Sequence, residues 1–383
     1  MEQPNLLEGN LPDPPTPHNA TRFEALDLLR AVAITLVFFF HYMILQGGQP
    51  TWLPKISRFG WTGVDLFFVL SGFLIAHQLF MQMKKEQKFS LKAFFLKRFF
   101  RIIPAYWVVL AVYFLFPFFR EKEALPPLWK FLTFTQNFTM NPMNLGTFSH
   151  AWSLCVEEHF YFFLPLMLLG LQRLKILNRS YVLVALLFIS GFAIRTYCYQ
   201  QLYLPRIEDE NSWIFWYKYL YYPTYTRLDG LLVGVTIAMI YVFRPEFWKK
   251  ITRYGNAILA ASLLLLFGAS CICEDEQSFA ASIFGFPLVD LGYGLLLIAG
   301  ISPGSVIFGL KSRASTFIAA ISFTIYLTHK GMVRMTHRLL DPLALDENLM
   351  LVICIFTSLA GAYLLYKCVE QPFMKLRKKL IPA

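Results

Sequence analysis

Two ionisable residues, Arg30 and His41, stand eleven residues apart in the first apolar segment of the chain. Eleven residues at about 100° each complete three helical turns, so both side chains fall on one face, about 16 Å apart along the axis. An ionisable group inside a bilayer costs several kcal/mol and by default faces the protein interior at a functional site. Histidine is also the usual general base near neutral pH. We therefore expect Arg30 and His41 to line a path across a membrane.

Each of the two residues also has a structural interpretation. Arg30 could be a helix-end residue that reaches the interface and pairs with Asp27. His41 could form a hydrogen bond between helices. Their shared face favours the functional interpretation of both.

A second group, which begins at Trp152, opens a later apolar segment. Ser153 and Glu157 are four residues apart and share a helical face near the predicted outer end, with Glu158 on a neighbouring stripe. Adjacent carboxylates at the head of a helix also complement its dipole. We expect Glu157 to orient or charge-stabilise a histidine from another segment, and His41 lies at the same predicted depth.

A third group marks the predicted cytoplasmic entrance of another segment. Arg98 and Arg101, at i and i+3, could clamp phosphates through paired hydrogen bonds, and Tyr106 follows them. Ordinary anchoring by cytoplasmic cations is the alternative. Among weaker signals, Arg227 and Asp229 favour an internal ion pair.

Two further patterns concern helix faces. Tyr326 and His329 line one side of a late segment. Small residues around Gly72 favour close helix packing.

Composition places all these residues in a membrane protein. Of 383 residues, 56% are hydrophobic and 15% are charged, whereas a soluble domain carries about a quarter charged residues. We predict an all-α, polytopic protein of about ten transmembrane helices. The predicted spans are 25–45, 61–82, 102–119, 152–172, 181–201, 227–243, 256–273, 281–301, 316–336 and 349–369.

Loop charges predict the orientation. With both termini cytoplasmic, the inner loops hold roughly twice as many lysines and arginines as the outer loops. The net charge of +11 is then explained by the inner loops, and no nucleic-acid partner is expected. The outer stretches 120–151 and 202–226 should line a cavity mouth.

The rest of the chain predicts little besides the membrane unit. Residues 1–22 should be a disordered cytoplasmic tail, 23–374 one membrane domain, and 375–383 a basic cytoplasmic tail. The six cysteines lack ligand spacing, so no metal site is expected.

Taken together and in order, these motifs resemble the bacterial transmembrane acyltransferase-3 family of O-antigen and polysaccharide O-acetyltransferases. The matching pieces are Arg30 with His41, 67–73, Arg98 with Arg101, Pro104 and Tyr106, Trp152–Ser153 with Glu157–Glu158, Arg227 with Asp229, 326–329, and Glu370 with Pro372–Phe373.

The resemblance implies a multi-pass protein of the bacterial cytoplasmic membrane. It would take an acyl group, usually acetyl, from cytoplasmic acyl-coenzyme A (acyl-CoA) and deliver it to a hydroxyl of an extracytoplasmic, surface or lipid-linked glycan. By this resemblance we assign catalysis to His41, Glu157 and Arg30. Donor binding is assigned to Arg98, Arg101, Tyr106, Arg30 and Ser153, and acceptor binding to Trp152, Glu158, Arg227, Asp229, Tyr326 and His329.

The spacing fits such a transfer, because a pantetheine arm is about as long as the separation of Arg30 and His41. We expect one continuous cavity in which His41, held by Glu157 or another carboxylate, deprotonates the hydroxyl. Transfer could be direct or pass through an acyl-enzyme. The rival interpretations are a transporter, which would show internal repeats, and a conduit that hands acetyl to a separate transferase.

Overall fold

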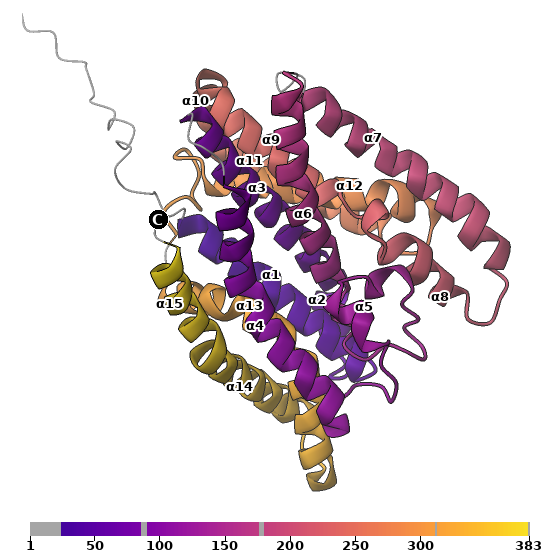
Figure 1. Cartoon of the computed structure of the whole chain (residues 1–383). Helices are drawn as coiled ribbons and strands as arrows, with labels where there is room; N and C mark the ends of the chain where they lie inside the picture. Colours follow the sequence, from indigo (N-terminus) through magenta and orange to yellow (C-terminus); the bar gives the residue numbers. More distant parts are fainter. Residues whose placement is uncertain (1–23, 86–89, 176–179, 311, 382–383) are drawn as a thin grey trace, which may run out of the picture.

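The computed structural model describes residues 24–85, 90–175, 180–310 and 312–381, and these ranges fold into helices without a strand. The predicted disordered tail, 1–22, lies outside the described residues. Each predicted span coincides with a long helix (Figure 1). The long helices are α1 (Glu24–Leu45), α3 (Gly63–Lys84), α4 (Leu91–Leu115), α6 (Trp152–Arg173), α7 (Ser180–Tyr197), α9 (Asp229–Phe243), α11 (Gly255–Ile272), α12 (Phe286–Gly300), α13 (Arg313–Leu340) and α14 (Glu347–Leu365). The short ones are α2 (Leu53–Ser57), α5 (Leu128–Leu132), α8 (Ser212–Trp216), α10 (Pro245–Thr252) and α15 (Gln371–Leu380).

Eight helical stretches of the described chain are long and apolar enough to cross a membrane, and a bent pair makes a ninth. The chain is therefore helical and polytopic as predicted, and the two predicted spans at α9 and α13 are those that fall short in length or apolarity on their own. Helix α9 has only 15 residues and qualifies together with α10, which bends away by 110°. Helix α13 has 28 residues, but polar and ionisable side chains interrupt its apolar sequence. Most of these side chains are buried, because α13 faces the protein interior.

Helix α4 begins eleven residues before the predicted span. Lys92, Lys97 and Arg98 interrupt the apolar pattern there, although their long stems can lie along apolar surface. The hydroxyl of Ser90 accepts a hydrogen bond from the backbone of Ala93 at 3.2 Å and caps the first turn. The cationic segment is therefore part of the helix.

Helix α3 lies at the centre of the bundle, against α1, α9 and α12. Its contact with α9 is close because glycines face each other. A Cβ atom at Gly72 would lie 2.9 Å from Leu231 Cα, and one at Gly234 would lie 2.5 Å from the Phe73 nitrogen. The predicted role of Gly72 in close packing is confirmed.

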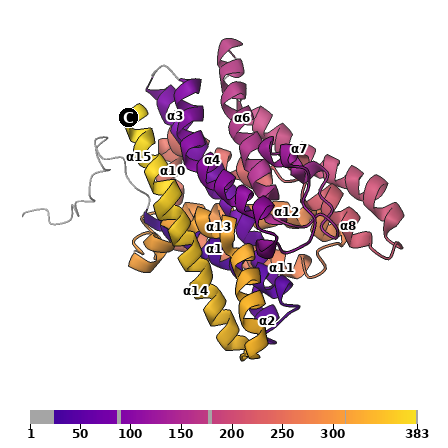
Figure 2. The same cartoon turned by 60° about the horizontal axis from the view of Figure 1, so that its bottom comes forward.

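The C-terminal helices lie on one side of the bundle (Figures 1 and 2), where α14 packs on α13 and α15 packs on α4. Residues 347–380 form one continuous helical run. The segment predicted as a basic tail from 375 onward is therefore helical up to Leu380, as the end of α15. It contacts α4.

The glycine contact yields a stability prediction. Gly234→Ala should lower the free energy of unfolding by about 1–3 kcal/mol, because the added methyl group meets the α3 backbone. Gly268→Ala is the matched control, because a Cβ there meets nothing within 4 Å. It should raise stability by about 0.5–1 kcal/mol, since alanine favours a helix over glycine. Thermal unfolding of both variants in detergent measures the difference, and equal effects would contradict the predicted contact.

Candidate active site

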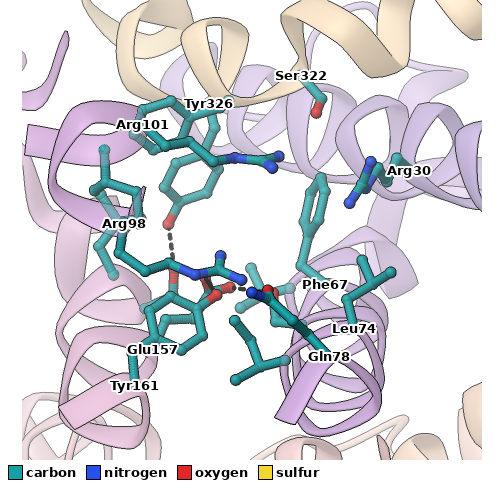
Figure 3. A pocket seen from close by; sticks show the side chains of 17 residues that line it. Arg30, Phe67, Leu74, Gln78, Arg98, Arg101, Glu157, Tyr161, Ser322 and Tyr326 are labelled. Carbon is teal, nitrogen blue, oxygen red and sulfur yellow. Dashed lines mark hydrogen bonds between the residues drawn. The ribbon is translucent and has the colours of Figure 1, made fainter. Parts of the chain in front are cut away.

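A cavity of about 280 Å³ lies between α1, α3, α4, α6 and α13, and we call it the central cavity. Three arginines from two helices line it: Arg30 from α1, and Arg98 and Arg101 from α4. Figure 3 shows the three guanidinium groups directed into the same space. Arg30 also lies 3.9 Å from Asp27. The structural pairing and the cavity-facing position predicted for Arg30 are therefore both present.

A carboxylate stands among these arginines. Glu157 accepts hydrogen bonds from Tyr161 at 2.6 Å and from Ser71 at 3.3 Å, and all three residues line the central cavity. The guanidinium carbon of Arg98 lies 4.9 Å from the centre of the Tyr161 ring. These contacts fix the rotamers of Glu157 and Arg98, so the arginine is held in place.

A second cavity, of about 440 Å³, contains His41, and we call it the aromatic cavity. One wall consists of Trp61, Trp152, Trp213, Tyr217, Tyr221 and Tyr222. The two predicted outer stretches both line this cavity, so their predicted place at a cavity is confirmed. The first stretch contributes Glu121, Lys122, Pro142, Gly146, Ser149 and His150, and the second contributes Trp213, Tyr217, Tyr221 and Tyr222. Burial raises the pKa of Tyr217, Tyr221 and Tyr222, so these phenols are neutral hydrogen-bond donors at physiological pH.

His41 belongs to a cluster of three histidines. Its ring centre lies 5.0 Å from that of His329 and 5.9 Å from that of His150, and the last two rings are 5.0 Å apart. Helices α1 and α13, which pack together, supply His41 and His329. His150 comes from the loop before α6, and both of its ring nitrogens are buried without a hydrogen-bond partner in the described chain.

The hydrogen bonds of this cluster determine the tautomer of His41. His329 Nδ1 lies 3.0 Å from the carbonyl oxygen of Ile325 and 2.9 Å from that of Tyr326. A carbonyl only accepts, so Nδ1 carries the proton and Nε2 of the neutral ring is an acceptor. His41 Nδ1 lies 2.9 Å from this Nε2 and must donate to it. The lone pair of neutral His41 is therefore on Nε2, the nitrogen a general base would use.

The predicted pairing of His41 with Glu157 is wrong. Glu157 bonds to Tyr161 and Ser71 in the central cavity, whereas His41 bonds to His329 and lines the aromatic cavity. The sequence predicts how deep each residue lies in the membrane but not its position in the membrane plane. Two residues at the same depth can therefore lie in different cavities.

The expected continuous path is interrupted. Val64 and Tyr326 line both cavities, which therefore meet at these two side chains. The Tyr326 phenol makes hydrogen bonds with Ser153 Oγ at 2.7 Å and with the His150 carbonyl oxygen. Tyr326, assigned to the acceptor, and Ser153, assigned to the donor, together form this partition.

Three assigned binding residues lie elsewhere. Tyr106 is fully buried, donates to the Phe131 carbonyl at 3.1 Å and stacks on Phe134, so its donor-binding role is not supported. Arg227 forms a buried ion pair with Asp65 at 2.5 Å, and Asp229 pairs with Arg195. The internal ion pair favoured by the sequence is therefore present, although with other partners.

Arg227 packs behind two rings of the aromatic cavity. Its guanidinium carbon lies 4.8 Å from the Tyr221 ring centre and 5.3 Å from that of Trp152, and both rings line the aromatic cavity. Trp152, which the sequence assigns to the acceptor, lines the aromatic cavity. Glu158 has a buried oxygen without a partner among the described residues, and we have no physical account of it.

Sequence reasoning missed two polar residues of the aromatic cavity. His150 directly precedes the Trp152 group, and Lys330 directly follows His329, so both stood beside motifs already identified. Lys330 Nζ lies 3.0 Å from Ser149 Oγ and 3.9 Å from Glu121. Lys330 lies in α13, but its contacts are with residues before α6 and after α4, and these contacts depend on how the loops pack, which helical periodicity does not reveal.

The buried ion pair yields a second stability prediction. Asp65→Leu should lower the free energy of unfolding by about 3–5 kcal/mol, because it leaves the Arg227 charge buried without its partner. The double variant Asp65→Leu with Arg227→Met should recover most of that loss. Glu246→Ala is the control, because it breaks an exposed pair with Lys249 and should cost about 1 kcal/mol or less. An equal loss of stability in Asp65→Leu and Glu246→Ala, measured by thermal unfolding, would contradict the structural role of the pair between Asp65 and Arg227.

The geometry agrees with the comparisons with known proteins. The family model described as an acyltransferase domain, that of the acyltransferase-3 family, matches residues 23–367. The chain is 28% identical to the peptidoglycan O-acetyltransferase OatA of Listeria monocytogenes, over 83% of this chain and 50% of that protein. It is 24% identical to the O-acetyltransferase OatA of Staphylococcus aureus, over 91% of this chain and 57% of that protein.

The chain spans about half the length of these curated relatives. No solved structure matches it. Because the family model covers most of the chain, and the family motifs lie on helices that enclose two adjoining cavities, the protein belongs to the acyltransferase-3 family.

Proposed function

We propose that the chain transfers an acyl group, acetyl above all, from cytoplasmic acyl-CoA to a hydroxyl of an extracytoplasmic glycan. One observation carries the proposal: the two cavities adjoin, and they differ in chemistry. The central cavity is lined by three arginines, and the aromatic cavity by two imidazoles and eight aromatic rings. They meet at Val64 and Tyr326.

The central cavity suits the donor. Arg98 and Arg101, one helical turn apart, offer planar guanidinium groups that match phosphate geometry. The excess of cations in the loops at this end of the bundle supports a cytoplasmic position for it in the bacterial inner membrane, where acyl-CoA would be available. Arg30 and Ser153 lie in the same cavity and are placed to contact the acyl-bearing arm.

The aromatic cavity suits a sugar. Tryptophan and tyrosine rings offer broad apolar faces together with a polar edge, as carbohydrate rings require of a binding site. The relatives are named for O-acetyl transfer, one of them to peptidoglycan. We therefore propose a cell-wall or other surface glycan as the acceptor.

His41 would act as the general base. Its Nε2 takes the proton of the acceptor hydroxyl as the oxygen attacks the thioester carbonyl. The C–O bond of the new ester forms, the C–S bond breaks, and the coenzyme thiolate takes the proton from the imidazolium. Tyr326 lies between the two cavities, so its side chain must rotate to let the thioester carbonyl approach His41.

The function is tested on surface glycans. Mass spectrometry of glycan from cells with and without the protein should reveal an acetyl mass difference that mild base removes. His41→Ala should lower acetyl transfer by about 10²–10⁴-fold, because the base is lost. Its affinity for acetyl-CoA should not change, since His41 lies outside the central cavity. His337→Ala is the control, because His337 pairs with Asp341 at the end of α13.

Two outcomes would decide against the proposal. Full activity of a folded His41→Ala protein would remove the base from the mechanism. Acetyl-CoA consumption in reconstituted vesicles, with no ester on the supplied glycan, would favour a conduit that serves a separate transferase.

His329 is a positioning residue, and its role has a separate test. His329→Leu should lower kcat by roughly 10²–10³-fold, because His41 Nδ1 loses its acceptor and the ring its tautomer. His329→Gln should recover much of this loss, since a side-chain carbonyl can accept from His41. If only packing mattered, leucine would serve as well as glutamine. The comparison is made on kcat and its pH profile, with Tm as the folding control.

A further inference from the structure

A third cavity, of about 630 Å³, adjoins the central cavity where α15 packs on α4, and we call it the basic vestibule. Its lining consists of five cations with one glutamine and one isoleucine: Lys97, Arg98, Arg101, Arg377, Lys378, Gln78 and Ile381. The α4 cations and the α15 cations face one space. Arg377 and Lys378 lie beyond residue 367, where the match to the family model ends.

Five like charges in one cavity repel one another. Arg101 and Lys378 are exposed and the other three cations are half-buried, so water and salt screen part of this repulsion. Arg227 is paired with Asp65, whereas no carboxylate is among the described residues that line the vestibule. A set of cations arranged around a shared space is typical of a site for a polyanion, above all for phosphate oxygens, which lysine and arginine bind well.

The lining residues also define an order along the path. Arg30 lines the central cavity, Arg98 and Arg101 line both spaces, and Arg377 with Lys378 lines the vestibule. A ligand bound across both would place a slender arm in the central cavity and its phosphates at Arg98 and Arg101. Any further phosphate ester would lie against α15.

We propose that α15 forms one wall of a binding site for the phosphate-bearing nucleotide end of the donor, with Arg377 and Lys378 as its phosphate ligands. This inference rests on the proposed function, which supplies acyl-CoA as the donor. An anionic lipid headgroup has the same phosphate chemistry, and the experiment distinguishes the two sources.

The same helix supplies a matched control. Lys375, Lys378 and Lys379 are all exposed, but only Lys378 lines the vestibule, together with the half-buried Arg377. If α15 only bound the anionic lipid surface of the cytoplasmic leaflet, all four of its cations would contribute to that binding. It would need only Arg377 and Lys378 to bind the donor.

The test uses the full chain in nanodiscs of phosphatidylcholine. The Kd is measured for acetyl-CoA, for S-acetylpantetheine and for adenosine 3′,5′-bisphosphate. Arg377→Gln with Lys378→Gln should raise the Kd for acetyl-CoA and for the bisphosphate about tenfold or more, because charge-assisted hydrogen bonds are lost. The Kd for S-acetylpantetheine should not change. Lys375→Gln with Lys379→Gln should alter none of the three, and equal Tm values confirm folding.

The contrary outcomes are separable. Undiminished acetyl-CoA affinity in the Arg377 and Lys378 variant would overturn the inference and leave the proposed function standing. An equal loss in the control variant would also overturn it, in favour of general surface charge. In nanodiscs that also contain phosphatidylglycerol, loss of bound phosphatidylglycerol from the Arg377 and Lys378 variant with unchanged acetyl-CoA affinity would assign the vestibule to lipid. A wild-type protein that binds no acetyl-CoA would instead refute the proposed donor.

Discussion

The low dielectric of the membrane interior requires each ionisable side chain in this bundle to be paired or to face a cavity. Arg227 and Arg195 meet the requirement with aspartates, and both pairs are buried. Arg98 and Arg101 meet it by lining open space. The requirement thus separates structural charges from functional ones. It explains why Arg227 packs behind an aromatic wall while the α4 arginines project into cavities.

The same constraint shows what could be predicted from the sequence. The apolar segments and the shared face of Arg30 and His41 follow from helical periodicity, which is local. The partner of His41 does not, because it depends on which helices pack together. The sequence favours Glu157 on α6, whereas the contact of α1 with α13 brings His329 to His41 instead. Arg377 illustrates another limit of sequence reasoning. A basic C-terminal segment has the same composition whether it is a disordered tail or a helix that lines a cavity.

Tyr326 lies between the central cavity and the aromatic cavity. The positions of the ionisable residues in the sequence predict one continuous cavity, and this side chain divides it. Its phenol bonds to Ser153 and to the backbone of His150, both at the start of α6. A tyrosine held at two points keeps the central cavity apart from the aromatic cavity. Under the proposed function, this separation would shield a thioester in the central cavity from water that enters the aromatic cavity with the acceptor. Loss of these bonds when the acceptor binds would couple opening to occupancy.

The choice of a histidine, and not a carboxylate, as the partner of His41 follows from the bilayer as well. A carboxylate would strengthen the base, but it would have to be buried as a charge when no proton is being transferred. A neutral imidazole holds the same tautomer through one hydrogen bond and needs no counter-ion. The carbonyl oxygens of Ile325 and Tyr326 hold His329 in turn. The backbone of α13 therefore fixes the ring of His329, and the hydrogen bond from His41 Nδ1 to His329 Nε2 fixes the tautomer of His41.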